Sequence, residues 1–314
     1  MKTREEKGFS MKTSLVIMAA GLGSRYGGNK QVDGLGPNGE ILMEYSIYDA
    51  LRAGFGRVVF IIKPEMEQMM RRMVGYLEKK TAADGTPVEV AYAFQDFSSV
   101  PSFYHIPQGR TKPFGTVHAL LCAADAVPGP FCVINADDYY GIDAYRTIHR
   151  ELTALPPDGK AAMVGYLLKN TASLHGTVSR GVCSVEDGKL RSIREALRVQ
   201  LYPDGTLRDL QEDVPLDPET VVSMNFWGFA PGIFPRLRAY FEEFLRRDAG
   251  EDLKAECLLP VMVGELLRGG ELEVSVLRSA DRWFGMTYHE DRARVAEELR
   301  RLHESGVYPP SLRG

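Results

Sequence analysis

The chain has 314 residues, of which 44% are hydrophobic and 25% are charged, and its formal net charge is −4. This composition is typical of a globular protein with a sizeable core, and the acidic balance argues against a nucleic-acid-binding protein. No apolar run reaches the roughly 18 residues that a membrane span needs, and the first residues carry no apolar signal-peptide segment. We therefore expect a cytoplasmic protein, with residues 1–11 as an N-terminal extension and residues 12–314 as a single domain.

Short apolar runs alternate with helical patterns in the first half of the chain. The candidate strands are residues 15–19, 58–62, 88–94, 131–135 and 161–167, and the candidate helices are residues 41–53, 65–80, 116–126 and 145–155. This alternation predicts an α/β fold with a Rossmann-like, mostly parallel sheet flanked by helices. Ligands bind at the carboxyl ends of the strands in such sheets.

The pattern changes after residue 165. Residues 182–185 and 190–193 flank a turn and predict a hairpin, and further strands are expected at residues 221–229 and 272–277. Helical spacing returns at residues 233–246, 255–268 and 291–303. Residues 201–218 are rich in Pro, Asp and Gly, so we expect a long loop there.

A glycine-rich, basic segment directly follows the first candidate strand. Glycine lets the backbone approach a ligand closely, and this segment also carries two cations, Arg25 and Lys30. The dinucleotide fingerprint is excluded because Tyr26 stands at its third glycine, and the P-loop is excluded because Asn29 stands at its lysine. The alternative is a plain turn, but a turn does not require the two cations. The segment therefore predicts a phosphate-binding loop.

The pattern G-x-G-S-R-Y-G-G-x-K-Q closely resembles the loop of nucleotidyltransferases that act on sugar phosphates. In that family the loop wraps the triphosphate of an NTP, so the resemblance implies nucleotide contacts from Ala20, Gly21, Gly23, Ser24, Arg25 and Lys30. It implies the nucleotide-diphospho-sugar transferase fold, which is GT-A-like. It also implies a nucleotide-binding half at residues 12–150, an acceptor-binding half on the same sheet at residues 151–290, and a C-terminal helix and tail at residues 291–314.

Asp137 and Asp138 follow the apolar run of residues 131–134. Carboxylates at this edge of a sheet suit Mg²⁺, which takes oxygen ligands and shares its shell with water and substrate phosphates. In the family an aspartate at this point binds the metal, and the resemblance assigns that role to Asp137. Asp138 is either a helper or a structural cap, and the alternative for both residues is a simple turn.

Gln95 ends the third candidate strand, and Gly115 and Thr116 open the next helix. In the family a glutamine and a glycine in these places hold the nucleobase, so the resemblance assigns nucleotide contacts to all three residues. The alternative for Gln95 is a solvent-exposed position at the strand end. Lys112 is a further candidate for contacting a phosphate. The alternative for His118 is a position on a helix face without a role in the site.

Three residues of the second half are candidates for binding the acceptor. Asn225 lies in a segment that resembles the sugar-holding strand of the family, and Glu195 matches the glutamate of the family's E-K-P motif. The lysine of that motif is replaced by Ala196, so Arg180 or Arg194 would take over its contact with the sugar phosphate. The alternative for either arginine is a surface charge.

The end motif W-x-D-x-G-T is matched only in part by residues 283–287, and its aspartate is absent. In the family this aspartate supplies a second metal contact. Asp281 or Asn225 is the expected substitute, and we assign the second metal contact to Asp281.

The resemblance implies a Mg²⁺-dependent enzyme that transfers NMP from an NTP to a sugar 1-phosphate and releases pyrophosphate. Arg25, Lys30 and Asp137 are its expected catalytic residues, and its partners are the NTP and a phosphorylated small molecule, with neither nucleic acid nor membrane. The alternatives are a cytidylyltransferase acting on an alcohol phosphate such as phosphocholine, a glycosyltransferase, and a non-catalytic nucleotide sensor. The glycosyltransferase fits less well because its D-x-D pattern is missing. The nucleobase, the acceptor and the oligomeric state stay open.

Overall fold

The computed structural model describes residues 12–21, 34–250, 252–285, 288 and 290–314. Within this part of the chain, 11 strands form one mixed sheet in the order β10-β9-β8-β12-β6-β11-β4-β1-β2-β3, with β7 pairing with β11 and β8. The strands of this sheet are β1 (Ser14–Met18), β2 (Arg57–Ile62), β3 (Glu89–Phe94), β4 (Phe131–Asn135), β6 (Lys160–Leu167), β7 (Val178–Glu186), β8 (Lys189–Leu201), β9 (Leu207–Asp209), β10 (Val214–Leu216), β11 (Val221–Phe229) and β12 (Glu273–Arg278). A separate pair joins β5 (Asp138–Tyr139) to β13 (Phe284–Gly285).

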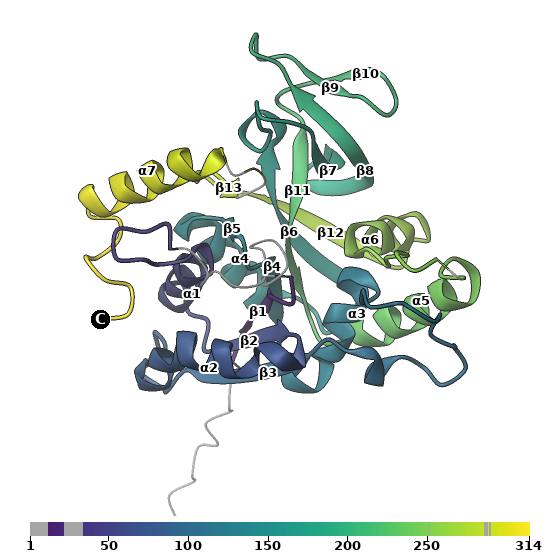
Figure 1. Ribbon diagram of the computed structural model, residues 1–314, viewed down its shortest axis with the longest axis horizontal. Helices are drawn as coiled ribbons and strands as arrows, with labels where there is room; N and C mark the ends of the chain where they lie inside the picture. Colours follow the sequence, from purple (N-terminus) through teal and green to yellow (C-terminus); the bar gives the residue numbers. More distant parts are fainter. Residues whose placement is uncertain (1–11, 22–33, 251, 286–287, 289) are drawn as a thin grey trace, which may run out of the picture.

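Helices cover both faces of the large sheet (Figure 1). Apolar residues of α1 (Leu42–Ala53), α2 (Glu67–Val74) and α4 (Ile142–Ala154) belong to one buried cluster. Those of α3 (Gly115–Cys122), α5 (Ile233–Arg247) and α6 (Leu259–Arg268) belong to a second cluster on the opposite face. The last helix is α7 (Asp291–Glu304), which packs in a third, smaller cluster with β5 and β13. Burial of these apolar surfaces is the main force that holds the layers together.

The first four strands form the parallel part of the sheet. They lie in the order β4-β1-β2-β3, with Leu15 opposite both Val58 and Cys132. The central residues of β1, β2 and β4 are buried, as expected for parallel strands covered on both faces, whereas those of the edge strand β3 are mostly half-buried. The carboxyl ends of the four strands therefore meet at one edge of the sheet.

The expectation of a mostly parallel sheet is wrong for the second half of the chain. There, β11 runs antiparallel to β4, β6 and β7, and β8 runs antiparallel to β7, β9 and β12, while β12 and β6 are parallel. Hairpin connections need only a short turn, whereas parallel pairs need a crossover. Because β11 pairs with β4 on one side and β6 on the other, strands from both halves lie in one sheet.

Several element boundaries differ from those expected. The predicted loop at residues 201–218 contains β9 and β10, which extend the β7–β8 hairpin into a projecting arm (Figure 1). The helix expected at residues 65–80 is divided into a short η1 (Pro64–Met66), α2 and η2 (Gly75–Lys79). Gly75, a weak helix former, stands where α2 ends. The helix expected at residues 255–268 begins only at Leu259, with Pro260 in its first turn. Other 3₁₀ helices are η3 (Phe97–Ser99), η4 (Ala124–Ala126) and η5 (Leu168–Asn170).

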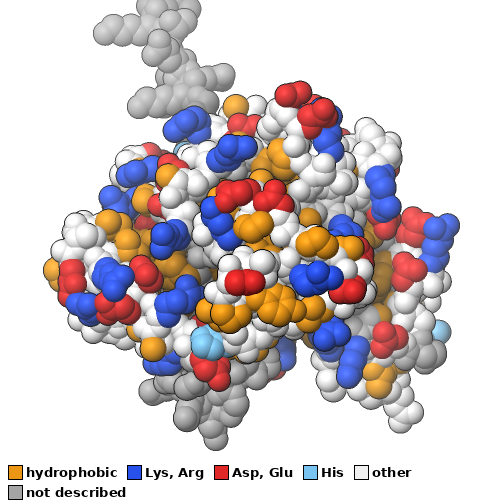
Figure 2. Space-filling view, turned by 90° about the horizontal axis from the view of Figure 1, so that it is seen from above, with side chains coloured by type: hydrophobic (Ala, Val, Ile, Leu, Met, Phe, Trp, Pro, Cys, Tyr) orange, Lys and Arg blue, Asp and Glu red, His pale blue; other side chains and the backbone are white. Residues whose placement is uncertain are grey.

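The surface mixes charged and apolar side chains. Figure 2 shows basic and acidic side chains interspersed with hydrophobic ones on the face seen from above. Among the described residues, no helix combines the length and the hydropathy that crossing a bilayer requires.

Candidate functional site

A cavity of about 630 Å³ opens at the carboxyl ends of the four parallel strands. We call it the strand-end cavity. It is lined by residues that follow β1, β2, β3 and β4, by the start of α3, and by the segment before α6, namely Met18, Ala20, Gly21, Lys63, Gln95, Thr111, Lys112, Pro113, Gly115, Thr116, Ala119, Asn135, Ala136, Asp137 and Glu256. Parallel topology accounts for this gathering, because each strand delivers its last residues to the same edge.

The structure brings together the predicted nucleotide contacts that it describes. Ala20, Gly21, Gln95, Gly115 and Thr116 all line the strand-end cavity, and so does Asp137. The other loop residues, Gly23, Ser24, Arg25 and Lys30, lie outside the described residues. Their contacts therefore stay predictions.

Gln95 is buried, with 8% of its surface exposed, so the alternative of a solvent-exposed strand end is wrong. Its side-chain amide donates a hydrogen bond to the Gly115 carbonyl at 3.0 Å. Gly115 has φ +84°, and a Cβ at this position would come within 2.8 Å of the Cys257 carbonyl oxygen. Both the backbone conformation and the lack of space therefore require glycine here.

Thr116 has a structural contact of its own. Its hydroxyl accepts a hydrogen bond from the Leu259 amide at 2.7 Å, and Val117 donates to the Cys257 carbonyl at 3.1 Å. The first of these bonds satisfies an amide at the start of α6 that has no partner within the helix. The start of α3 is thus tied to the segment that precedes α6.

Lys112 and His118 are both engaged by protein groups. Lys112 forms an ion pair with Glu256 at 2.9 Å on the rim of the strand-end cavity. His118 is fully buried and stacked on Phe241, its Nδ1 accepts from the Phe114 amide, and its Nε2 lies 2.9 Å from the Ser99 hydroxyl. Burial lowers the pKa of His118 to about 4, so the ring is neutral at physiological pH and serves the packing of α3.

Lys63 lines the strand-end cavity and was missed by the sequence analysis. It is the first residue after β2. Within the described part of the chain, its ammonium has no ion pair or hydrogen bond to another side chain. The available signal was the one used for Asp137, a charged residue directly after a buried strand.

A second cavity, of about 430 Å³, adjoins the first. We call it the hairpin cavity. The two cavities share Asn135 and Asp137, and the hairpin cavity continues along β7, β8 and β11 to Asp138, Thr177, Val178, Ser179, Arg180, Gly181, Glu195, Ser223, Met224, Asn225, Pro260 and Trp283. All three predicted acceptor contacts, Arg180, Glu195 and Asn225, therefore lie in one cavity that meets the other at Asp137.

Asn225 sits at an irregularity of β11. Its φ is +58°, and the pairing of β11 with β6 shifts register between Ser223 and Trp227. Its side-chain oxygen is buried and has no hydrogen-bond partner within the described residues. Backbone strain and an unsatisfied buried oxygen both cost stability, and such features concentrate at ligand sites.

Arg180 is a buried cation, with 8% of its surface exposed. Its guanidinium donates to the carbonyl of Thr171 through Nε at 3.1 Å and through Nη2, and to that of Ser179 at 2.6 Å, and it lies 5.1 Å from the centre of the Trp283 ring. Within the described part of the chain, no carboxylate lies within ion-pair distance of it. Burial lowers the pKa of Arg180 to about 10, while Asp138 and Glu195 act in the opposite direction.

Glu195 and Arg194 occupy different environments although they are adjacent. Burial raises the pKa of the Glu195 carboxyl, and the nearby Arg180 partly opposes this shift. Arg194 instead forms ion pairs with Asp209 at 2.7 Å and Glu212 at 3.0 Å, where the arm begins. Of the two arginines that could replace the missing lysine, Arg180 is thus the one that lines the hairpin cavity.

The Asp138 carboxylate, next to Asp137 in the chain, accepts hydrogen bonds from neighbouring side chains. Its Oδ2 accepts from the Asn135 amide at 2.9 Å and the Tyr140 hydroxyl at 3.1 Å. Gly285 pairs with Asp138 across β13 and β5, and a Cβ on Gly285 would come within 2.6 Å of Asp138 Oδ1. The glycine in the altered end motif therefore leaves the space that the Asp138 carboxylate uses.

The assignment of Asp281 as a metal ligand is not supported by its position. Its Oδ2 accepts from the amides of Asp143 at 2.6 Å and Ala144 at 3.4 Å, so it caps the start of α4. Burial raises the pKa of its carboxyl. Asp281 lines neither of the two cavities that share Asp137. Its carboxylate is used for capping because β12 ends beside the first turn of α4.

The donors at the junction of the cavities fit a hard cation. Asp137 and Asp138 offer carboxylate oxygens, and Asn225 offers an unsatisfied amide oxygen on the wall of the hairpin cavity. Within the described residues, no group of three or more His, Cys, Asp or Glu side chains is close enough to hold a metal. One or two carboxylates with completion by substrate oxygens is the arrangement that Mg²⁺ uses with phosphate ligands.

Comparison with solved structures gives the same fold at low identity. A putative glucose-1-phosphate thymidylyltransferase from Bacillus anthracis, in complex with a sucrose, matches with a TM-score of 0.60 and 16% identity, over 96% of this chain and 98% of that one. The inositol-1-phosphate CTP transferase from T. maritima matches with a TM-score of 0.56 and 11% identity, over 93% and 97% of the two chains. A UDP-glucose pyrophosphorylase complexed with UDP-glucose matches with a TM-score of 0.55 and 14% identity, over 92% and 98%.

No curated protein matches the sequence at a significant level. The family model described as Nucleotidyl transferase matches residues 15–250, which include both cavities apart from Pro260, Trp283 and Glu256. The α/β architecture, the strand-end cavity and this match agree, and the chain belongs to the nucleotidyl transferase family.

Proposed function

We propose that the protein transfers a nucleotidyl group from an NTP to the phosphate of a sugar or cyclic polyol phosphate, with Mg²⁺ as cofactor. The observation that carries this proposal is that two cavities meet at Asp137. A reaction that joins two phosphorylated substrates needs two compartments that open onto one reacting centre.

The strand-end cavity suits the NTP. Gln95 retains an amide oxygen for a base edge, and Gly115 offers flat backbone against which a base ring can lie. Lys63 adds a cation to the cavity wall. Arg25 and Lys30, which lie outside the described residues, are proposed to bind the triphosphate from the glycine-rich loop, since arginine's planar fork suits phosphate oxygens.

The hairpin cavity suits a polar acceptor. Arg180 supplies a buried positive charge, Asn225 an unsatisfied oxygen, and Glu195 a carboxyl group for hydroxyls. A quaternary ammonium such as that of phosphocholine prefers open aromatic faces, whereas here the guanidinium of Arg180 lies over the Trp283 ring. These contacts favour hydroxyl-rich acceptors, as in the neighbours named for glucose and inositol phosphates.

In the proposed reaction, an oxygen of the acceptor phosphate attacks the α-phosphorus in line. The new P–O bond forms as the bond between the α-phosphorus and the bridging oxygen breaks, and pyrophosphate leaves with that electron pair. Mg²⁺ would supply charge neutralisation at the phosphate oxygens, with Asp137 and Asp138 as its protein ligands. Lys30 would stabilise charge at the α-phosphate and the leaving group, and Arg180 would orient the acceptor.

The test is a panel assay on the full chain. Each of the four ribonucleoside triphosphates and dTTP is combined with glucose 1-phosphate, other sugar 1-phosphates, inositol 1-phosphate and phosphocholine in Mg²⁺, and pyrophosphate is measured. We expect pyrophosphate from a hydroxyl-rich acceptor and none from phosphocholine. Tight NTP binding without pyrophosphate from any acceptor would instead support the non-catalytic sensor, which the altered end motif favours.

A further inference from the structure

The C-terminal segment, residues 290–314, lies outside the family match and packs against Leu35, which follows the glycine-rich segment, and against Tyr139, which follows the two aspartates. Val295, Leu299, Tyr308 and Leu312 are buried in one apolar cluster that also contains Leu35, Tyr139 and Phe284. Leu35 follows the glycine-rich loop closely in sequence, and Tyr139 lies two residues after Asp137. Figure 1 shows α7 beside β13 and the C-terminus running next to α1.

Tyr308 connects the tail to the aspartate turn. It is 1% exposed, its hydroxyl lies 2.8 Å from that of Tyr139, and it donates to Asp49 Oδ2 at 2.6 Å. The Tyr139 ring stacks on Phe284 with centroids 4.2 Å apart and an interplanar angle of 4°. Because Tyr139 directly follows Asp138 in the chain, its contact with Tyr308 links the C-terminal tail to the turn that carries both aspartates.

Arg313 fastens the end of the tail to α1. It binds Glu44 with two parallel hydrogen bonds of 2.6 and 2.8 Å, and Glu44 is fully buried. Glu44 also accepts from the Ile41 amide at 3.0 Å at the start of α1. A buried carboxylate destabilises the folded state when it has no partner. The contact between Arg313 and Glu44 therefore couples the position of the tail to the stability of α1.

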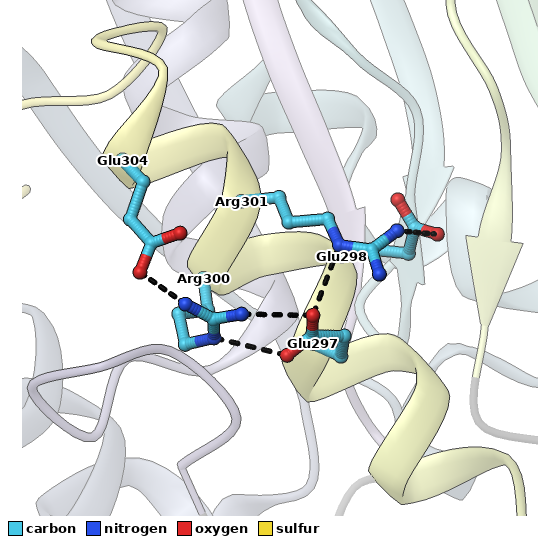
Figure 3. A network of polar contacts seen from close by, with 5 residues as sticks. All are labelled: Glu297, Glu298, Arg300, Arg301 and Glu304. Atoms are coloured by element: carbon cyan, nitrogen blue, oxygen red, sulfur yellow. Dashed lines mark hydrogen bonds and ion pairs between the residues drawn. The ribbon is translucent and has the colours of Figure 1, made fainter.

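Arg292 links α7 to Gly34. Its guanidinium donates to the Gly34 carbonyl at 3.1 Å, directly after the glycine-rich segment. The outer face of α7 carries Glu297, Glu298, Arg300, Arg301 and Glu304 in a network of ion pairs (Figure 3). These pairs are exposed and contribute little each, so the specific contacts of the segment are those on its inner face.

We infer that residues 290–314 form a clasp that positions the Asp137 turn and residues 34–35 relative to each other, with Tyr308 as its central positioning residue. This inference rests on the proposed function for its effect on catalysis. Residues 34–35 and the Asp137 turn follow different strands, β1 and β4. Pairing fixes the two strands relative to each other, but it does not fix the segments that follow them. Phosphoryl-transfer catalysis depends on alignment, and small displacements reduce the rate strongly.

Tyr308→Phe tests the clasp, because it keeps the ring and removes both hydrogen bonds of the hydroxyl. We expect amide hydrogen exchange to accelerate at least several-fold in peptides covering residues 136–141. We also expect kcat to fall about tenfold while KM for the NTP changes less. Tyr139→Phe removes the same tyrosine–tyrosine bond from the other side and should reproduce the kcat effect, and the double variant should be no slower than either single one.

Two control variants separate positioning from general stability. Arg300→Ala disrupts the exposed network of α7, and Val88→Ala removes buried volume in a different core cluster. Both should leave exchange at residues 136–141 and kcat unchanged at a temperature well below unfolding, although Val88→Ala lowers the melting temperature. Unchanged exchange in both tyrosine variants overturns the clasp. If the wild type forms no pyrophosphate, the proposed function fails, and hydrogen exchange alone then decides whether the clasp holds the turn.

Discussion

The two cavities of the protein are built in different ways. The strand-end cavity takes its lining from residues that directly follow parallel strands, such as Gln95 after β3 and Asp137 after β4. The hairpin cavity takes its lining from within antiparallel strands and from a bulge, as with Arg180 in β7 and Asn225 in β11. The lining residues of the strand-end cavity can thus be identified from their place after a strand. Those of the hairpin cavity depend on strand register and on the face of the strand from which each side chain projects.

The largest expected effect tests Lys30, which we propose binds the NTP from the glycine-rich segment. Lys30→Ala should reduce kcat by about 10²–10³, because one lost charge contact at a reacting phosphate commonly costs that much. The melting temperature should stay close to that of the wild type. Pyrophosphate release at the wild-type rate by the purified variant would falsify the role of Lys30. Lys160→Ala serves as the matched control, because Lys160 forms an exposed ion pair with Glu273 and lines neither cavity.

The second prediction concerns the hairpin cavity. Arg180→Gln should raise KM for the acceptor by about 10-fold or more, since a charged hydrogen bond contributes about 1.5–3 kcal/mol, and should leave KM for the NTP nearly unchanged. Arg194→Gln is the matched control, because Arg194 pairs with Asp209 and Glu212 instead. Equal effects from both arginines on acceptor KM would contradict the separation of the two cavities.

A pH prediction tests the contact between the first half and the C-terminal tail. Asp49 is fully buried, and burial raises the pKa of its carboxyl from 3.8 to about 7, so the folded state retains a proton that the unfolded state loses. The stabilisation is fully present below about pH 3.8 and is lost as the pH rises to about 7. After burial, the hydrogen bond from Tyr308 lowers the pKa of Asp49, the charge of Asp281 raises it, and the charges of Arg52 and Arg146 lower it.

Asp49→Asn should therefore remove part of the pH dependence of stability. Between pH 4 and 7, the free energy of unfolding should fall less steeply than in the wild type, by up to about 1.4 kcal/mol per pH unit. Urea denaturation at several pH values measures the difference between the two slopes. Parallel slopes would show that Asp49 is already ionised in the folded protein.

The smallest expected effect concerns Lys63. Lys63→Ala should raise KM for the NTP only about three- to fivefold, because an ammonium at the cavity wall adds a solvated, flexible contact. The acceptor KM should not change, which separates Lys63 from Arg180. A rise in KM for the acceptor alone would contradict the placement of Lys63 in the nucleotide site.

Sequence reasoning succeeded where local pattern and structure coincide. The strands of the parallel half are largely apolar runs, and their positions agree with β1 to β4 within a residue or two. The failures share a different cause. The strands β9 and β10 are three residues long each and gain stability by extending the hairpin, so composition alone indicated a loop. The assignment of a metal contact to Asp281 stays a prediction, and its capping of α4 depends on a tertiary contact that no local pattern indicates.

The sequence by itself determined the family, the positions of the first four strands and the residues that follow them. These features are local, because a buried strand is a run of apolar residues and a phosphate-binding loop is rich in glycine. Only the tertiary structure decided that Arg180 rather than Arg194 lines the hairpin cavity, that Asp138 fills the space beside Gly285, and that Tyr308 reaches the aspartate turn. These contacts join residues far apart in the chain. They depend on register, strand direction and side-chain packing, which periodicity and composition do not encode.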